Sequence, residues 1–248
     1  MPKSAPEHML HAGLMAHSPD GAALAFLEFC HEGNRRYGGA IHPDITLDYI
    51  AMGRSLPAWD AGDVASVRST LAKSIERLKA AGAAFFFCPD NTAHIALEAD
   101  GSALALPGLN IAEVVAEEAL QKSFTKVGIL GTKYTMDGPV YDRALNSRGI
   151  ETAVPELAVR LEIDRIIFEE LCNGQLADKS RQYYVDTIES LKANGCDAVA
   201  LVCTEIPLLI TPDNSPLPTL NSTKLLSLEA FRVGIGEAPL PSWTGGPL

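Results

Sequence analysis

The spacing of apolar residues along this chain alternates between the period of a helix and the length of a buried strand. Over residues 61–81, apolar side chains recur every three or four positions from Val64 to Leu78, which predicts an amphipathic helix that ends at Gly82. Further helices are predicted over residues 22–34, 92–99, 111–122, 137–148, 162–172 and 178–194.

Apolar runs between these helices predict strands. Phe85–Cys88 and Ala198–Val202 are short and apolar throughout, as expected for parallel strands that are covered on both faces. Further strands are predicted at Ile45–Ala51, at Lys126–Thr132, where the strand runs into a Gly-Thr turn, and over residues 151–154. Because strands and helices alternate, we expect an α/β fold built on parallel sheets.

One segment occurs twice in the chain. Ser74–Gly82 reads Ser-Ile-Glu-Arg-Leu-Lys-Ala-Ala-Gly, Thr187–Gly195 reads Thr-Ile-Glu-Ser-Leu-Lys-Ala-Asn-Gly, and each continues into an apolar run. Carried forward without a gap, this register sets Asp90 against Cys203. Both residues follow a predicted strand, and parallel sheets bind ligands beyond the carboxyl ends of their strands. Two similar halves that each present one ionisable group to a shared cleft would suit a reaction that removes a proton on one face and supplies one on the other.

The repeat also predicts where the halves begin and end. We expect an N-terminal α/β half over residues 1–120 and a C-terminal α/β half over residues 121–225. Residues 226–248 are predicted to form a helix and an irregular tail, rich in proline and glycine, that packs back on the N-terminal half.

Composition narrows the range of partners and compartments. The net charge is -11, from 20 Lys and Arg against 31 Asp and Glu, without a basic cluster, which argues against a nucleic-acid partner and favours a small molecule. No apolar stretch approaches the roughly 18 residues of a membrane span, and no uninterrupted signal-peptide core follows the start. The five cysteines show no pairing pattern and no CxxC motif, so we expect reduced thiols in a cytoplasmic protein, without a metal site.

Three motifs carry a family resemblance. They are Pro-Asp-Asn-Thr-Ala-His at residues 89–94, Gly-Ile-Leu-Gly-Thr-Lys-Tyr-Thr at 128–135, and Cys-Thr-Glu-Ile at 203–206, with further matches at 168–175 and in the Tyr183-Tyr184 helix. Through them the chain resembles the cofactor-independent aspartate/glutamate racemase family over roughly residues 45–230. The resemblance implies two α/β domains related by pseudo-twofold symmetry, an active site in the cleft between them, catalysis without PLP or another cofactor, and frequently a homodimer.

The same resemblance implies the catalytic residues. In that family a cysteine precedes the first motif's Asn-Thr-Ala-His and another begins Cys-Thr-Glu, so that one thiolate removes the Cα proton while the opposite thiol delivers one. This chain keeps Cys203 but has Asp90 in the first position. We expect nearby donors or a helix amino terminus to lower the pKa of Cys203. For Asp90, a catalytic carboxylate and a plain helix cap both stay open. Cys88 would lie about 6 to 7 Å from the position of Asp90 along a strand, so it is interpreted as a core residue.

Other polar residues suit substrate binding. By resemblance, the residues that would hold the substrate are Asn91, Thr92, Thr132, Thr135, Thr204 and Glu205, with turn and cap roles as the alternative. Arg54 is a candidate to hold a distal carboxylate, or else a surface residue. Cys172 stands where some aspartate-specific relatives have a lysine. His17 is a candidate extra proton carrier, the alternative being an ordinary loop histidine.

Three functions are compatible with these residues. The first is a racemase or epimerase of an acidic amino acid that uses Cys203 and Asp90. The second is a decarboxylase or isomerase with a single thiol on the same scaffold. The third is a binding protein that has lost turnover, which the retained Cys203-Thr204-Glu205 disfavours.

Overall fold

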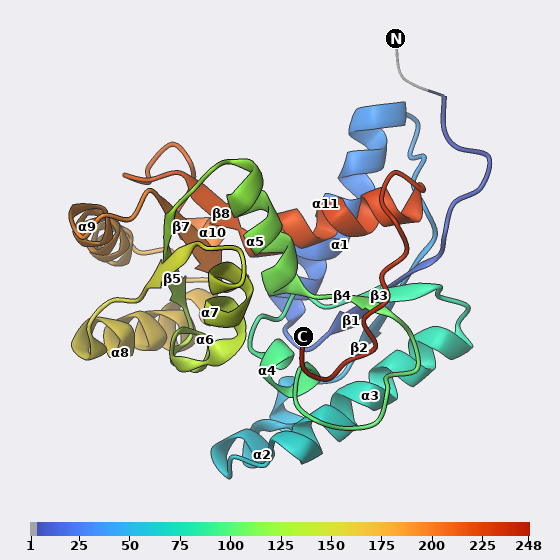
Figure 1. Cartoon of the computed structure of the whole chain (residues 1–248), viewed down its shortest axis with the longest axis horizontal. Helices are drawn as coiled ribbons and strands as arrows, with labels where there is room; N and C mark the ends of the chain where they lie inside the picture. Colours follow the sequence, from blue (N-terminus) through green and yellow to red (C-terminus); the bar gives the residue numbers. More distant parts are fainter. Residues whose placement is uncertain (1–3) are drawn as a thin grey trace. The chain divides into compact units, whose positions relative to one another are not determined.

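The computed structural model describes residues 4–248, which form two compact units. Unit 1 contains the chain up to Ile111 together with Thr223–Leu248, and unit 2 is the continuous segment Ala112–Ser222. Each unit is built on a parallel sheet of four strands with helices packed against it (Figure 1). The predicted α/β fold with parallel sheets is therefore confirmed.

The sheet of unit 1 has the strand order β2-β1-β3-β4. Its strands are β1 (Ala12–Ala16), β2 (Ile45–Tyr49), β3 (Phe85–Phe87) and β4 (Gly108–Leu109). In the middle of the sheet Leu14 of β1 pairs with Leu47 of β2 on one side and with Phe87 of β3 on the other. The residues of β1 and β3 are all buried, as expected for central strands covered on both faces.

Six helical segments belong wholly or mostly to the described part of unit 1. They are α1 (Pro19–Tyr37), η1 (Met52–Arg54), α2 (Leu56–Asp60), α3 (Val64–Ala80), α4 (Ala93–Leu97) and most of α11 (Ser222–Gly234). The carboxylate of Asp63 accepts a hydrogen bond of 3.0 Å from the backbone N–H of Ser66 and so caps α3. The periodic apolar face of α3, including Leu71 and Ile75, is buried in the core of unit 1.

The sheet of unit 2 repeats this arrangement. Its order is β6-β5-β7-β8, so that in both units the first strand in sequence lies second in the sheet. The strands are β5 (Lys126–Gly131), β6 (Glu151–Ala153), β7 (Ala198–Val202) and β8 (Thr219–Asn221). Gly82 and Gly195, which end the two copies of the repeated segment, both have positive φ angles, 94° and 89°. Each then leads into the third strand of its sheet, β3 or β7, so the sequence repeat is also a structural repeat.

Several helices of unit 2 lie where the sequence predicted them, and two short ones, over residues 133–137 and 206–209, were not among the predicted helices. The helices are α5 (Ile111–Gln121), α6 (Lys133–Asp137), α7 (Pro139–Asn146), α8 (Leu157–Arg165), α9 (Asp178–Ala193) and α10 (Ile206–Leu209). The continuous helix predicted over residues 162–172 is wrong. After α8 the chain widens into a π-helical turn, η2 (Ile166–Glu170), and then tightens into a 3-10 turn, η3 (Leu171–Asn173).

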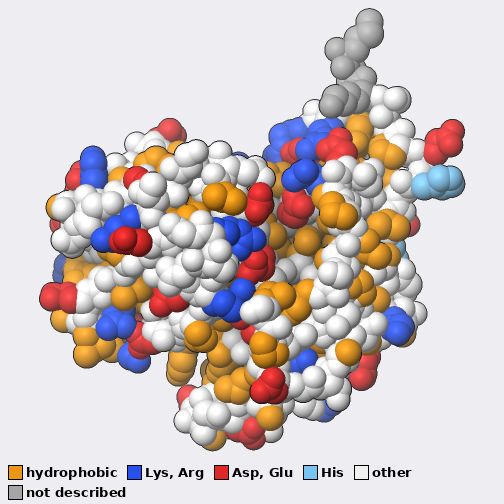
Figure 2. Space-filling model, viewed as in Figure 1, with side chains coloured by type: hydrophobic (Ala, Val, Ile, Leu, Met, Phe, Trp, Pro, Cys, Tyr) orange, Lys and Arg blue, Asp and Glu red, His pale blue; other side chains and the backbone are white. Residues whose placement is uncertain are grey.

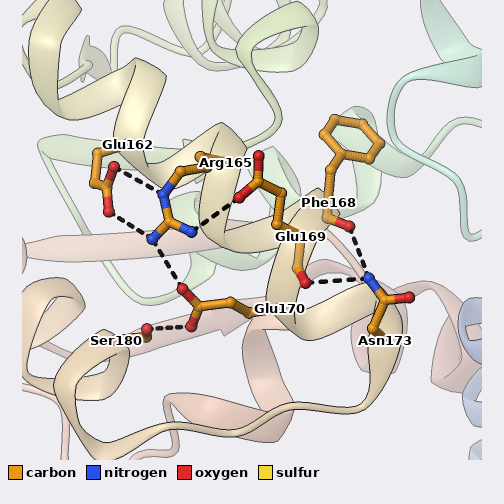
Figure 3. A network of polar contacts seen from close by, with 7 residues as sticks. All are labelled: Glu162, Arg165, Phe168, Glu169, Glu170, Asn173 and Ser180. Atoms are coloured by element: carbon orange, nitrogen blue, oxygen red, sulfur yellow. Dashed lines mark hydrogen bonds and ion pairs between the residues drawn. The ribbon is translucent and has the colours of Figure 1, made fainter.

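A network of charges accompanies this change of helix type. The guanidinium of Arg165 binds the carboxylates of Glu162, at 2.7 Å, and of Glu169 and Glu170, at 3.2 and 2.8 Å (Figure 3). Glu170 also accepts a hydrogen bond from the hydroxyl of Ser180 in α9. The network therefore ties the π-helical turn to the helix that carries the second copy of the repeat.

The carboxyl-terminal segment belongs to unit 1. The backbone N–H groups of Leu104 and Gly108 donate to the carbonyls of Thr244 and Trp243, at 2.7 and 2.8 Å. The indole ring of Trp243 also stacks on the ring of His94. This segment has no regular secondary structure beyond α11, yet its backbone is fixed along β4.

The surface carries charges of both signs. On the face shown in Figure 2, Lys and Arg side chains lie among Asp and Glu side chains rather than in one continuous basic patch. Among the residues the structure describes, no helix is long and apolar enough to cross a membrane.

Candidate active site

The site in unit 2 is built around Cys203, which directly follows β7. Its thiol is buried and donates a hydrogen bond of 2.9 Å to Oε2 of Glu205. The hydroxyl of Thr204 donates to the same oxygen at 2.6 Å. Thr204 and Glu205 are buried as well, so a carboxylate and a thiol share a hydrogen bond in a place from which water is largely excluded.

The electrostatics of Cys203 differ from the expectation. Burial raises the pKa of the Cys203 thiol well above its ordinary value, and the charge of Glu205 and its hydrogen bond raise it further. A backbone N–H of Glu205 acts in the opposite direction without reversing the result. The expected lowering of the pKa is therefore wrong, and Cys203 is a protonated thiol at neutral pH.

Thr132 and Thr135 lie at the same edge of this sheet. Gly131, the last residue of β5, pairs with Val202, the last residue of β7. Thr132 and Cys203 are the residues that directly follow these two strands. The hydroxyl oxygen of Thr132 accepts a hydrogen bond of 3.3 Å from the backbone N–H of Thr135 and caps α6, and the two hydroxyls lie 3.0 Å apart. The cap role is thus present, and Thr132 follows β5 level with Cys203 after β7.

Tyr184 of α9 packs in the same hydrophobic cluster as Cys203. Burial raises the pKa of its phenol well above the ordinary value, and the nearby carboxylates of Asp164, Glu170 and Glu205 raise it further. The hydroxyl of Tyr184 is buried and has no hydrogen-bond partner in the part of the chain that the structure describes. Sequence reasoning found this helix but assigned no role to Tyr184, because its surroundings come from distant segments.

Cys172, at the position where some relatives have a lysine, has an exposed side chain.

The first motif lies at the carboxyl end of β3 in unit 1. Oδ1 of Asp90 accepts a hydrogen bond of 3.3 Å from the backbone N–H of Ala93, the first residue of α4. Asp90 is only partly buried, whereas Asn91 and Thr92 are buried. Asp90 therefore caps α4 with one oxygen, which leaves a proton-carrying role for the carboxylate open.

Cys88 lies in the core of unit 1, as interpreted from the sequence. Its side chain is 0 % exposed, and burial raises the pKa of the thiol well above its ordinary value. A thiol that is both inaccessible and firmly protonated is a packing group.

Two further candidates lie at the carboxyl side of the same sheet. Arg54 ends η1 beyond β2, is exposed, and has no ion pair within residues 4–248. His17 directly follows β1 and is buried, with Nδ1 2.8 Å from the carbonyl oxygen of Ile50. Across the part of the chain that the structure describes, no group of three or more His, Cys, Asp or Glu side chains is arranged to hold a metal ion.

Comparison with known families decides between the classes of protein with this fold. A model described as Asp/Glu/hydantoin racemase matches residues 18–228, which is most of the chain. The chain belongs to the Asp/Glu/hydantoin racemase family. It is therefore an isomerase of the racemase type, and both strand-end motifs, at residues 89–94 and 203–206, fall inside the matched region.

Solved structures of racemases share its fold. A putative Asp/Glu racemase from Yersinia pestis is 27% identical, with a TM-score of 0.79 over 91% of this chain and 99% of that chain. An aspartate racemase homologue from Pyrococcus horikoshii is 25% identical, with a TM-score of 0.77 over 91% and 99%. A glutamate racemase from Aquifex pyrophilus, 20% identical, has the same fold at a TM-score of 0.59 over 89% of this chain and 82% of its own.

Proposed function

We propose that this member of the racemase family racemises or epimerises an acidic amino acid, aspartate or glutamate. The observation that carries the proposal is the buried hydrogen bond between Cys203 and Glu205 at the end of β7. A thiol that can exchange its proton with an adjacent carboxylate is a reversible acid and base, as proton transfer at Cα requires. The names of the similar structures, which include aspartate and glutamate racemases, support an acidic substrate.

On one face of the substrate, Cys203 is the proton carrier. Its raised pKa keeps the thiol protonated, so in one direction the S–H bond breaks and a C–H bond forms at the carbanionic Cα. In the other direction the carboxylate of Glu205 takes the thiol proton, and the thiolate then removes the Cα proton. Glu205 already accepts the thiol hydrogen, so this exchange needs no rearrangement.

On the other face, Asp90 is the proposed carrier. Its carboxylate follows β3 as Cys203 follows β7, and the structural repeat supports equivalent roles for the two residues. The proposed contacts to the substrate α-carboxylate come from Asn91, Thr92, Thr132, Thr135 and Thr204. Arg54, exposed and without an ion pair among the described residues, is proposed to bind the distal carboxylate.

The proposal extends to the conditions under which the enzyme works. Two side-chain proton carriers need no electron sink, so we propose catalysis without PLP. The reduced thiols support a cytoplasmic location, and the family resemblance supports a homodimer. The acidic composition supports a small-molecule substrate rather than nucleic acid.

Hydrogen exchange at Cα tests the function directly. Single enantiomers of aspartate and of glutamate are incubated with the protein in deuterated water, and loss of the Cα proton and appearance of the opposite enantiomer are followed by NMR and chiral chromatography. We expect both, and neither with the Cys203→Ala variant. Absence of Cα exchange from every enantiomer would overturn the proposal, and exchange without inversion would favour a single-thiol enzyme instead.

A further inference from the structure

His17 lies at the carboxyl edge of the sheet of unit 1, between two strands. It follows β1, which pairs with β2 on one side and β3 on the other. Leu14 of β1 is level with Phe87 of β3. Leu14–Phe87 is the last pair of these two strands, and the same register extended three residues beyond it makes His17 level with Asp90.

The hydrogen bond of His17 fixes which ring nitrogen carries the proton. Nδ1 lies 2.8 Å from the carbonyl oxygen of Ile50, and a carbonyl oxygen can only accept. Nδ1 therefore donates, and whenever the ring is neutral its lone pair is on Nε2. A backbone carbonyl bound to one nitrogen is a common way to hold a histidine in a single tautomer and orientation.

Nε2 of His17 has no hydrogen-bond partner among residues 4–248. It is buried and makes no hydrogen bond, in a side chain that is 1 % exposed. Unpaired polar atoms of this kind are rare in native proteins and ask for an explanation. The two ring nitrogens point in divergent directions, so the bond from Nδ1 to Ile50 turns Nε2 away from β2. The neighbour of β1 on its other side is β3, which leads to Asp90.

We propose that His17 is a positioning residue that relays protons to and from Asp90, so that a carboxylate and an imidazole together replace the thiol absent from the first motif. The proposal rests on the proposed racemase function. It explains why Nε2 of His17 is buried without a hydrogen-bond partner in the described chain. It also explains how a carboxylate, which is a weak base, could remove a proton from Cα. Imidazole is a stronger base than a carboxylate, so a proton passed on to it is held more firmly.

The relay has two balanced steps. The Cα–H bond breaks, its electron pair stays on Cα, and an O–H bond forms on Asp90. In the resting structure Nε2 of His17 makes no hydrogen bond to any described residue, so Asp90 must first turn its O–H toward it. That O–H bond then breaks as an N–H bond forms at Nε2, which gives an imidazolium beside a restored carboxylate. The reverse steps return the proton to Cα and leave His17 neutral. Its Nδ1–H remains hydrogen-bonded to the carbonyl oxygen of Ile50.

Two asparagine variants at opposite ends of β1 separate the relay from a structural role. In His17→Asn the side-chain amide can still donate to Ile50, but no base stands at the position of Nε2. His11→Asn is the matched control, because His11 directly precedes β1 and binds Thr46 through Nε2 at 2.8 Å, at the amino edge of the sheet. Circular dichroism and thermal unfolding establish that both variants are folded.

The readout is deuterium exchange at Cα from each enantiomer of aspartate and glutamate separately. The enantiomer served by Asp90 is the one whose exchange Asp90→Asn suppresses. We expect His17→Asn to slow exchange of that enantiomer by on the order of 100-fold, and to leave exchange of the other, served by Cys203, near wild type. His11→Asn should change neither. Unchanged exchange in His17→Asn, or an equal loss for both enantiomers in a folded variant, would overturn the relay.

A measurement without substrate tests the same proposal independently. Nitrogen-15 NMR of the imidazole rings in the wild-type protein should show His17 with its proton on Nδ1 and a bare Nε2, assigned by comparison with His17→Asn. A proton on Nε2 in the resting protein would overturn the relay. Absence of Cα exchange in the wild type, with the expected tautomer present, would instead count against the racemase function on which the relay rests.

Discussion

Cys203 and Glu205 share a buried hydrogen bond in which the thiol donates to Oε2 at 2.9 Å. The pair holds one proton, and that proton is on the sulfur. Burial and the negative charge of Glu205 both raise the pKa of the thiol and so keep the proton there. The sulfur is consequently a proton donor at rest and becomes a base only when Glu205 accepts the proton.

Replacing Glu205 by glutamine should make the Cys203 thiol easier to deprotonate and yet slow the Cα exchange that it catalyses. Loss of the negative charge lowers the pKa of the thiol, although burial still keeps it raised, so thiolate absorbance should appear at lower pH than in wild type. Cα exchange at Cys203 should nevertheless fall by on the order of 100-fold, because the amide cannot take the thiol proton. Glu169→Gln, in the exposed Arg165 network, is the control. A thiol that titrates at higher pH in Glu205→Gln would contradict this account.

The two buried cysteines should respond differently to alanine. Cys203→Ala should abolish exchange and turnover, since it removes the proton carrier. Cys88→Ala should lower the free energy of unfolding by on the order of 1 kcal/mol, with activity retained, because its side chain only fills the core. Urea unfolding and racemase assays on both variants check this. An equal loss of activity in a well-folded Cys88→Ala would make Cys88 the working thiol.

Asp90 distinguishes a catalytic carboxylate from a helix cap. Asparagine caps about as well as aspartate, so Asp90→Asn should keep the bond to Ala93 and the stability of unit 1. Racemisation should be suppressed, leaving at most Cys203-driven exchange from one enantiomer. By resemblance to the family, Asp90→Cys should raise two-way racemisation. Undiminished racemisation in Asp90→Asn would reduce the role of Asp90 to capping.

Removal of the Tyr184 hydroxyl should stabilise the folded protein. The hydroxyl is buried without a partner, so Tyr184→Phe relieves an unmet desolvation cost at almost constant volume. We expect the free energy of unfolding to rise by about 1 kcal/mol in thermal or urea denaturation. Tyr183→Phe, one residue earlier on a more exposed face, should change it little. A destabilised Tyr184→Phe would mean that the hydroxyl has a partner in solution.

Stability should decline at alkaline pH. Burial raises the pKa of the Cys88 and Cys203 thiols well above the ordinary value of 9.0, so the folded state keeps both protons where the unfolded chain loses them. Their contribution is complete below about pH 9 and is lost as the pH rises toward the folded-state values, by up to about 1.4 kcal/mol per pH unit for each thiol. Urea unfolding as a function of pH measures the slope, which Cys88→Ala should reduce. A slope that is the same in that variant would contradict the assignment.

The long helices α3 and α9 and the strands β3, β5 and β7 were predictable because their signals are local. The face of α3 follows from apolar spacing alone, and the run Phe85–Phe87 is recognisable by its composition. Strand β1 was missed, since Ala12–Ala16 contains small residues and no β-branched side chain. Its strand character comes from pairing with β2 and β3, which lie far along the chain. Strand β4, which begins at Gly108, was missed for the same reason, because it is defined by its pairing with β3.

The site was predictable in place but not in electrostatics. The repeat and the motifs found Cys203 and located it at a strand end. The direction of its pKa shift depends on how deeply Glu205 and the thiol are buried together, which no spacing records. Glu205, expected to contact substrate, also accepts a hydrogen bond from Cys203, which the sequence did not predict. The π-helical turn after Arg165 was hidden likewise, since residues 162–172 keep a helical apolar pattern through it.

The division of unit 1 into two distant segments of chain has a consequence for biosynthesis. Unit 2 is complete once Ser222 has left the ribosome, whereas unit 1 still lacks Thr223–Leu248. The backbone of Gly108 finds its partner only when Trp243 emerges. Unit 1 begins first in the sequence, yet its fold can be completed only after all of unit 2 and Thr223–Leu248 have been synthesised.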